Sequence, residues 1–171
     1  MICLITGGSG CGKSTWAEKL VRSLPAGDRV YIATMQVYDR ESEIRVQRHR
    51  AQRAGLGFRT VECEKDLAAV HVQAKSVVLL EDLVNLTANE MFDGGDPDRI
   101  VPALEDLAVR CGHLVMVTND LFSDGEPYSP SVQEYMRRLA EINRRAAVLA
   151  DCVVEMVYSV PVVLKGELPC L

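Results

Sequence analysis

The sequence lacks several features that mark other classes of protein. No apolar run approaches the roughly 20 residues that a membrane-spanning helix requires. None of the six cysteines forms a CxxC or CxxxC pair, which argues against a structural zinc site. The first ten residues have neither the basic segment nor the length of a secretory signal peptide. We therefore expect a cytoplasmic protein with no membrane span.

Positive charge is also scarce. The chain carries 19 Lys and Arg against 24 Asp and Glu, a net charge of −5. On this balance we expect no broad electrostatic binding to nucleic acid.

The cysteines are expected to be small buried side chains in a reducing compartment. Cys11 is the exception, since its place in a glycine-rich loop predicts an accessible thiol.

Short apolar runs alternate with amphipathic segments along the 171 residues. We expect strands at residues 2–6, 30–33, 58–61, 77–80, 114–117 and 153–158. We expect helices at residues 14–23, 41–52, 67–74, 85–92, 99–111 and 131–149. Residues 94–98 and 121–130 are expected to be loops, and the tail from Pro161 is expected to be short. Because the strands are continuous aliphatic runs, they are typical of a mostly parallel sheet with helices on both faces.

A glycine-rich segment lies between the first expected strand and the first expected helix. It consists of Gly7, Gly8, Ser9, Gly10, Cys11, Gly12, Lys13 and Ser14, with Thr15 directly after it. This matches GxxxxGK[ST], whose backbone N–H groups surround phosphate oxygens at a helix N-terminus. Lys13 can reach the β- and γ-phosphates, and the Ser14 hydroxyl can bind Mg²⁺. The fold predicted is therefore α/β and P-loop NTPase-like, with residues 1–171 as a single nucleotide-binding domain.

Two carboxylates follow the aliphatic run at residues 77–80. Glu81 or Asp82 can hold Mg²⁺ or its water ligands beside a phosphate loop. The alternative for Asp82 is a helix N-cap. We expect at least one of the two to serve the nucleotide or its metal ion.

One of the three histidines lies among arginines. If residues 41–52 are helical, Arg45, His49 and Arg53 share one face. Cationic neighbours favour the neutral imidazole, which is the nucleophilic form, and they could neutralise a triphosphate. The alternative is a solvated basic face with an incidental histidine. We expect His71 and His113 to be surface or structural residues.

Together these segments resemble a known family, the bifunctional adenosylcobinamide kinase/adenosylcobinamide-phosphate guanylyltransferases of coenzyme B12 synthesis. The similarity extends over nearly the whole chain. It is carried by the glycine-rich loop and by residues 31–34, 36, 45–50, 60–63, 79–81, 117–119, 143 and 150–151.

The resemblance implies an activity in two steps. A nucleoside triphosphate, ATP or GTP, phosphorylates the hydroxyl of a corrinoid substrate with Mg²⁺, and GTP then donates GMP through a covalent intermediate on His49. The residues implied to contact the guanine nucleotide are Thr34, Arg50, Arg53, Glu62 and Glu81. The resemblance also implies a homotrimer.

The sequence departs from the family pattern where the corrinoid is implied to bind. Phe122 stands in place of a glycine, and Tyr135-Met136-Arg137 in place of Phe-Arg-Asp. Two alternatives therefore stay open. One is a P-loop small-molecule kinase without a covalent step, and the other is a nucleotide-binding regulatory protein without turnover.

Overall fold

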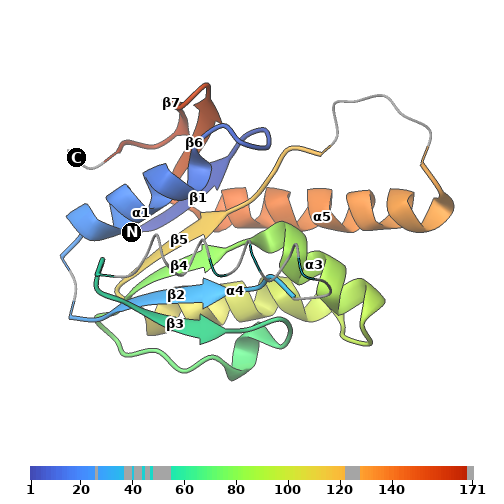
Figure 1. Cartoon of the computed structure of the whole chain (residues 1–171), viewed down its shortest axis with the longest axis horizontal. Helices are drawn as coiled ribbons and strands as arrows, with labels where there is room; N and C mark the ends of the chain where they lie inside the picture. Colours follow the sequence, from blue (N-terminus) through green and yellow to red (C-terminus); the bar gives the residue numbers. More distant parts are fainter. Residues whose placement is uncertain are drawn as a thin grey trace.

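A mostly parallel sheet of seven strands organises the described part of the chain in the computed structural model (Figure 1). The structure describes residues 1–25, 27–36, 40, 44, 47, 55–121 and 128–168. In sheet order, the strands are β3 (Phe58–Glu62), β2 (Arg29–Ala33), β4 (Val77–Glu81), β5 (His113–Val117), β1 (Ile2–Thr6), β6 (Cys152–Val157) and β7 (Val160–Lys165). Only the pairing of β6 with β7 is antiparallel within this sheet.

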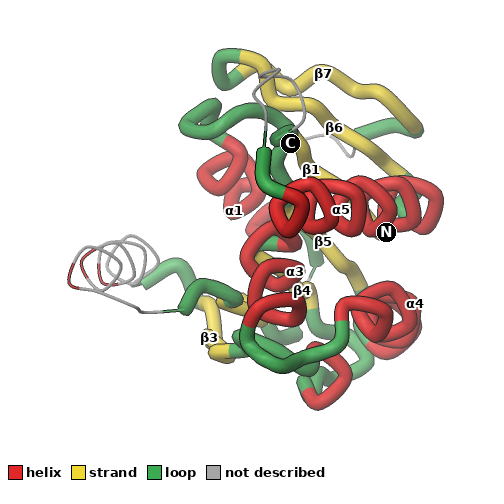
Figure 2. Tube along the Cα trace, turned by 90° about the vertical axis from the view of Figure 1, so that its right-hand side faces the viewer, coloured by secondary structure: helices red, strands yellow, loops and turns green. Residues whose placement is uncertain are grey.

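Helices cover both faces of the sheet, as the aliphatic strands predict. The α-helices are α1 (Lys13–Ser23), α3 (Leu83–Phe92), α4 (Ile100–Arg110) and α5 (Pro130–Leu149), with 3-10 turns η1 (Leu67–Ala69) and η2 (Pro97–Arg99). Figure 2 shows α1 on one side of the sheet and α3, α4 and α5 on the other. None of the described helices is both long enough and apolar enough to cross a membrane.

Alternate residues of the strands supply two apolar cores. On β1, Cys3 and Ile5 pack with Trp16 and Leu20 of α1, whereas Leu4 packs in the cluster that holds α3, α4 and α5. The central strand β4 is buried from Val77 to Leu80, which explains its uninterrupted aliphatic sequence. This packing fixes the carboxyl ends of the strands, where ligands of parallel sheets bind.

The expected helix at residues 67–74 is wrong beyond its first turn. Only Leu67–Ala69 is helical, as a 3-10 turn, and Val70 is extended with φ −73° and ψ 123°. The Arg110 guanidinium donates to the Val70 carbonyl at 2.8 Å, and the Ser76 hydroxyl accepts from Gln73 N at 3.2 Å. These contacts satisfy backbone groups that a continued helix would have used itself.

The structure adds two elements to those expected. Residues 97 and 98, expected in a loop, belong to η2, so the loop expected at residues 94–98 is wrong at its end. The tail from Pro161 is part of the strand β7, which the sequence did not predict and which pairs with β6 through a turn at Tyr158 and Ser159, where φ is +49° and +66°. Consecutive positive φ values are typical of a tight hairpin turn, so β6 ends at Val157 rather than at Tyr158.

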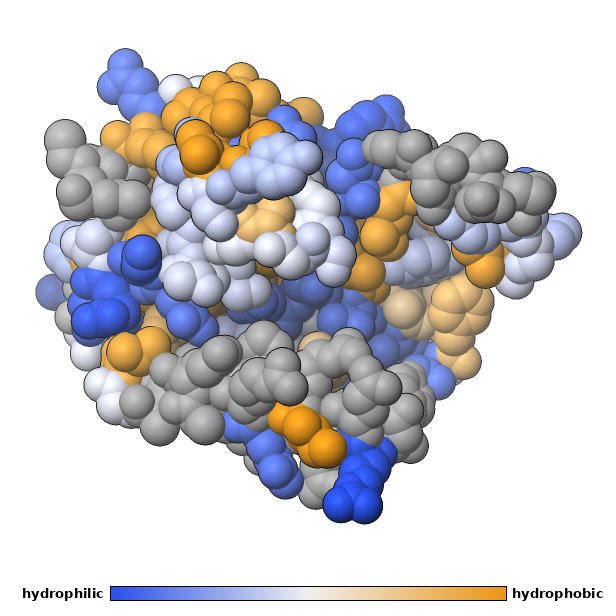
Figure 3. All heavy atoms as spheres, turned by 45° about the horizontal axis from the view of Figure 1, so that its top comes forward, coloured by the Kyte–Doolittle hydropathy of each residue, from blue (hydrophilic) through white to orange (hydrophobic). Residues whose placement is uncertain are grey.

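The strand β7 leaves apolar side chains exposed at the edge of the sheet. Val160, Val162, Val163 and Leu164 are 41–59% exposed. The hydrophobic colouring at the top of Figure 3 lies over this part of the molecule.

The five described cysteines have free thiols. Cys3, Cys63, Cys111 and Cys152 are buried, as expected, whereas Cys11 in the glycine-rich loop is half-buried.

Candidate nucleotide-binding site

The phosphate loop joins β1 to α1 and encloses the ammonium group of Lys13. Lys13 is 8% exposed, and its Nζ donates to the carbonyls of Gly7 and Gly8 at 2.8 and 2.6 Å. Gly8, Ser9, Gly10 and, in the first turn of α1, Thr15 are exposed. The loop therefore presents accessible backbone around a buried positive charge, which suits a phosphate chain.

Close contacts with the β6–β7 hairpin explain two of the glycines. Gly7 has φ +138°, and a Cβ there would lie 2.6 Å from the Met156 carbonyl oxygen. Gly12 has φ +93°, and its Cβ would lie 2.8 Å from Ser159 Oγ. The Ser159 amide also donates to the Cys11 carbonyl at 3.0 Å. The hairpin that the sequence did not predict therefore supports the phosphate loop from the β6 side.

Ser14 and Glu81 meet at the other end of the loop. The Ser14 hydroxyl donates to Glu81 Oε1, which places the start of α1 at the end of β4. Within the described residues, the second carboxylate oxygen, Oε2, is buried and has no hydrogen-bond partner. A hydroxyl beside a carboxylate with a spare buried oxygen is the donor set that Mg²⁺ prefers. Among the residues described, no cluster of three or more His, Cys, Asp or Glu forms a metal site.

Asp82 has a different task from Glu81. Its side chain accepts from Asn85 N at 2.8 Å and caps α3, the alternative that the sequence left open. Burial raises the pKa of Asp82 to about 6, and the neighbouring charge of Glu81 contributes to the rise, against hydrogen bonding by Asn85 and the charge of Lys13. The cap favours Glu81 over Asp82 as the carboxylate that serves a metal ion.

Thr34 fixes the backbone of this pair of carboxylates. It is fully buried, and its hydroxyl accepts from Asp82 N at 2.7 Å and donates to Asp82 O at 2.9 Å. Its own amide donates to the Glu81 carbonyl at 3.1 Å. The side chain of Thr34 is thus occupied within the protein, so its placement favours a positioning role over the direct nucleotide contact that the resemblance implied.

Asn89 is a site residue that the sequence analysis missed. It is 4% exposed on α3, and its amide donates to the carbonyls of Thr34 and Glu64, both at 2.8 Å. One side chain therefore joins the ends of β2 and β3. The sequence signal was weak, because the buried residues of α3 also include the polar Thr87 and Glu90.

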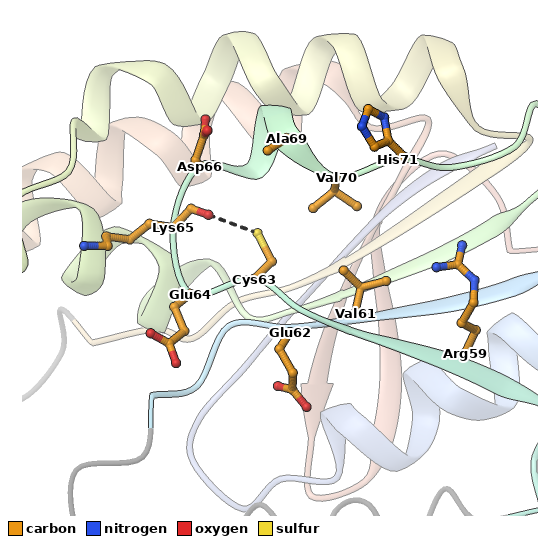
Figure 4. A pocket seen from close by; sticks show the side chains of 10 residues that line it. All are labelled: Arg59, Val61, Glu62, Cys63, Glu64, Lys65, Asp66, Ala69, Val70 and His71. Carbon is orange, nitrogen blue, oxygen red and sulfur yellow. Dashed lines mark hydrogen bonds between the residues drawn. The ribbon is translucent and has the colours of Figure 1, made fainter.

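The end of β3 borders a pocket of about 530 Å³ at the edge of the sheet (Figure 4). Glu62 is exposed there, and its side chain points away from Val70 and His71. The thiol of Cys63 donates to the Lys65 carbonyl at 3.3 Å, and burial raises its pKa to about 11. A carboxylate on an accessible rim, as Glu62 provides, can accept from the N–H groups of a guanine base.

His49, the expected nucleophile, lies outside the described residues. So do Arg45, Arg50 and Arg53 and the greater part of the helix expected at residues 41–52. The other two histidines have the surface and structural settings expected. His71 is exposed, and His113 Nδ1 lies 3.2 Å from the N-terminal nitrogen, with its pKa lowered by partial burial and by that charge.

Residues near the expected corrinoid region form a contact between β5 and α5. The Thr118 hydroxyl donates to Asn143 Oδ1 at 2.8 Å, which joins two segments that carried the resemblance. The Tyr135 hydroxyl donates to the Val84 carbonyl at 3.1 Å, so this departure from the family pattern anchors α5 to α3. Burial and the charge of Asp82 raise the pKa of Tyr135 to about 12. Phe122 lies outside the described residues.

Solved structures share the fold of this chain and, with its glycine-rich loop between β1 and α1, support the predicted P-loop NTPase-like fold class. The flagellar accessory protein FlaH from Methanocaldococcus jannaschii superposes with a TM-score of 0.53 at 12% identity, covering 97% of this chain and 78% of FlaH. A second solved structure, an ATPase domain, gives a TM-score of 0.52 at 13% identity, covering 96% of this chain and 76% of that domain. At these identities the likeness concerns the fold alone, and it confirms the predicted fold class.

The family follows from the sequence comparison. Residues 3–164 match the model of the cobinamide kinase/cobinamide phosphate guanyltransferase family, and the chain belongs to that family. Two curated proteins that are similar to this chain are each named bifunctional adenosylcobalamin biosynthesis protein CobU. The one from Escherichia coli K12 is 30% identical and the one from Salmonella typhimurium LT2 is 29% identical, each over 96% of this chain and 100% of the relative. The expected class of enzyme, a kinase and nucleotidyltransferase, is thereby confirmed.

Proposed function

We propose that this enzyme phosphorylates the hydroxyl of adenosylcobinamide and then transfers GMP from GTP to the resulting phosphate. The observation that carries the proposal is the contact of Ser14 with Glu81 beside the phosphate loop, in a chain of this family. Residues 1–171 would act as one nucleotide-binding domain, with residues 7–15 holding the triphosphate.

In the kinase step the substrate hydroxyl oxygen attacks the γ-phosphorus, and its proton passes to water. The bond from that phosphorus to the β,γ-bridging oxygen breaks, and the nucleoside diphosphate leaves. Lys13, buried within the loop, stabilises the negative charge that moves to the leaving oxygen. Ser14 holds Glu81 beside the start of α1, where the γ-phosphate of a triphosphate bound to the loop would lie.

In the guanylyl step His49 attacks the α-phosphorus of GTP. A P–N bond forms, the bond to the α,β-bridging oxygen breaks, and pyrophosphate leaves. A phosphate oxygen of the corrinoid then attacks the same phosphorus, which releases neutral imidazole and completes the transfer. Arg50 and Arg53 would neutralise the phosphates, and Glu62 would accept from the guanine base. Guanylyl transfer thus takes place in two displacements, one by His49 and one by the corrinoid phosphate. The phosphate loop needs to stabilise the leaving pyrophosphate only in the first of them.

Ser14 and Glu81 fit a Mg²⁺ ion better than the third candidate, Asp82. The Ser14 hydroxyl and the unpartnered Oε2 of Glu81 are oxygen donors at one place, whereas Asp82 caps α3. When bound, Mg²⁺ would neutralise charge on the triphosphate.

A product assay tests the proposal. We expect adenosylcobinamide and γ-labelled ATP to give labelled corrinoid phosphate, and addition of GTP to convert it to a GDP-linked product. Labelled corrinoid phosphate without the GTP-dependent product would leave a monofunctional kinase. Tight nucleotide binding without either product would indicate a regulatory protein.

The homotrimer and the cytoplasmic location belong to the same proposal. Val160, Val162, Val163 and Leu164 expose apolar surface on β7, which favours association with another copy. Buried thiols such as Cys3 and Cys152 suit a reducing compartment. Light scattering during size-exclusion chromatography would show a mass of three chains, and a single-chain mass would contradict the trimer.

A further inference from the structure

The phosphate loop borders one pocket directly, on its β6 side, whereas its other side leads along the strand ends toward β4 and β3. The strand β1, which precedes the loop, lies between β5 and β6 in the sheet. On the β5 side, the first turn of α1 reaches the end of β4, where Ser14 contacts Glu81. The β3 pocket with Glu62 is on that side of the sheet. On the β6 side, residues 8–11 of the loop and residues 155–159 of the hairpin line a second pocket, of about 680 Å³.

The two steps of the proposed function require opposite orientations of the triphosphate. In the guanylyl transfer proposed above, Glu62 and Glu81 contact the guanine nucleotide, so the base would lie on the β4 and β3 side of the loop. For phosphoryl transfer, the γ-phosphate must lie at Ser14 and Glu81, because this is the end of the loop that serves the transferred group. The nucleoside then leaves the loop on the opposite side, which is the side of the second pocket.

The second pocket has the groups that a purine base needs. Tyr158 is 93% exposed at the tip of the turn, so its ring is available for stacking. Glu155 lines the same pocket and can accept from the amino group of adenine or from the N–H groups of guanine. Hydrogen bonds from the Ser159 amide (3.0 Å) and hydroxyl (3.4 Å) to the Cys11 carbonyl hold the turn against the loop.

We propose that the pocket between residues 8–11 and 155–159 binds the purine base of the triphosphate that donates its γ-phosphoryl group. The inference rests on the proposed function, since it requires one loop to serve both steps. Tyr158 supplies the stacking surface, and Glu155 accepts hydrogen bonds from either purine. The kinase step therefore discriminates weakly between ATP and GTP, because Glu155 accepts from both purines.

Binding measurements on Tyr158→Ala and Tyr158→Phe test the base pocket. Loss of one stacking ring should weaken ATP binding at least fivefold, and Tyr158→Phe should bind ATP as wild type does. Inorganic tripolyphosphate has no base, so its affinity should be equal in all three proteins. The KM for ATP in the kinase step should rise in Tyr158→Ala with kcat unchanged, and labelling of the protein by α-labelled GTP should not change. Equal ATP affinity in Tyr158→Ala and wild type would overturn the proposal.

Photolabelling with 8-azido-ATP locates the base directly. We expect the label on the tryptic peptide of residues 146–165, and a label on residues 60–65 would contradict the pocket assignment. Tripolyphosphate binding by Lys13→Ala distinguishes a wrong base pocket from a wrong proposed function. If Lys13→Ala binds tripolyphosphate as wild type does, the phosphates do not occupy the loop and the proposed function itself is wrong. If only Tyr158→Ala has no effect, the loop assignment stands and the base pocket alone is wrong.

Discussion

The Ser14 hydroxyl donates a hydrogen bond to Glu81 Oε1 and so joins the first turn of α1 to the end of β4. The neighbouring carboxylate, Asp82, accepts from Asn85 N at 2.8 Å instead. Adjacent acidic residues therefore face different partners. The difference separates a carboxylate available to a nucleotide and its metal ion from one that begins a helix.

We expect Glu81→Gln to reduce both activities far more than Asp82→Asn. The amide in Glu81→Gln cannot supply the charge that a metal ion needs, whereas the side-chain oxygen in Asp82→Asn still caps α3. Steady-state rates against Mg²⁺ concentration would show the difference. A larger loss of activity in Asp82→Asn would transfer the metal-binding role to Asp82.

Lys13→Ala should lower the rates of both steps by a factor of about 10²–10³, since one preorganised charge at the transition state is typically worth that much. The expected cause is electrostatic, so the variant should still fold cooperatively, with a thermal unfolding midpoint lowered only by the lost hydrogen bonds to the Gly7 and Gly8 carbonyls. Lys19→Ala is the matched control, because Lys19 lies on the exposed side of the same helix. More than about a tenth of the wild-type rate in Lys13→Ala would contradict the assignment.

Asn89→Ala should reduce the free energy of unfolding by about 1–3 kcal/mol, because it leaves the Thr34 and Glu64 carbonyls without their donor. The KM for GTP in guanylyl transfer should rise as the ends of β2 and β3 separate. Urea unfolding and initial rates measure the two effects. Val84→Ala is the control, because Val84 is half-buried on the same helix and its hydrogen bond to Tyr135 uses the backbone carbonyl. Equal losses in the two variants would show that the bonds from Asn89 do not stabilise these strand ends.

The ion pairs of Glu134 should make stability depend on pH. Hydrogen bonds from Arg137 and Arg138 lower the pKa of Glu134 to about 2, so its stabilising effect is present above pH 4.5 and disappears as the pH falls from 4.5 toward 2. The urea midpoint of wild type should exceed that of Glu134→Gln at pH 7, and the difference should shrink below pH 4. A difference that stays constant between pH 7 and pH 3 would contradict the shift.

Most of the sheet could be predicted because its strands are continuous aliphatic runs. Residues 2–6 match β1 at both ends, and residues 77–80 and 114–117 differ from β4 and β5 by one residue. The phosphate loop could also be predicted, because its glycines and Lys13 stand at the spacing that phosphate binding requires between a strand and a helix. These features depend on neighbours in the sequence, which is why a single sequence sufficed for them.

Features fixed by distant contacts could not be predicted. The strand β7 exists because it pairs with β6, and Pro161 gave no local sign of a strand. The segment after Ala69 is extended because Arg110 binds the Val70 carbonyl from 40 residues away. In the site, the bonds from Asn89 to Thr34 and Glu64 span 55 and 25 residues. Asn89 is buried together with Thr87 and Glu90 on α3, so its polarity alone does not single it out in the sequence.

Retention of the α-label from GTP by the denatured protein tests the central claim most directly. We expect wild type to acquire the label in the presence of Mg²⁺ and pyrophosphatase, and we expect the bond to be labile in acid and stable in base, as a phosphoramidate is. His49→Ala should acquire no label and should still phosphorylate the corrinoid, whereas His71→Ala and His113→Ala should behave as wild type does. A wild-type protein that never acquires the label, or a His49→Ala variant that retains it, would contradict covalent guanylyl transfer through His49.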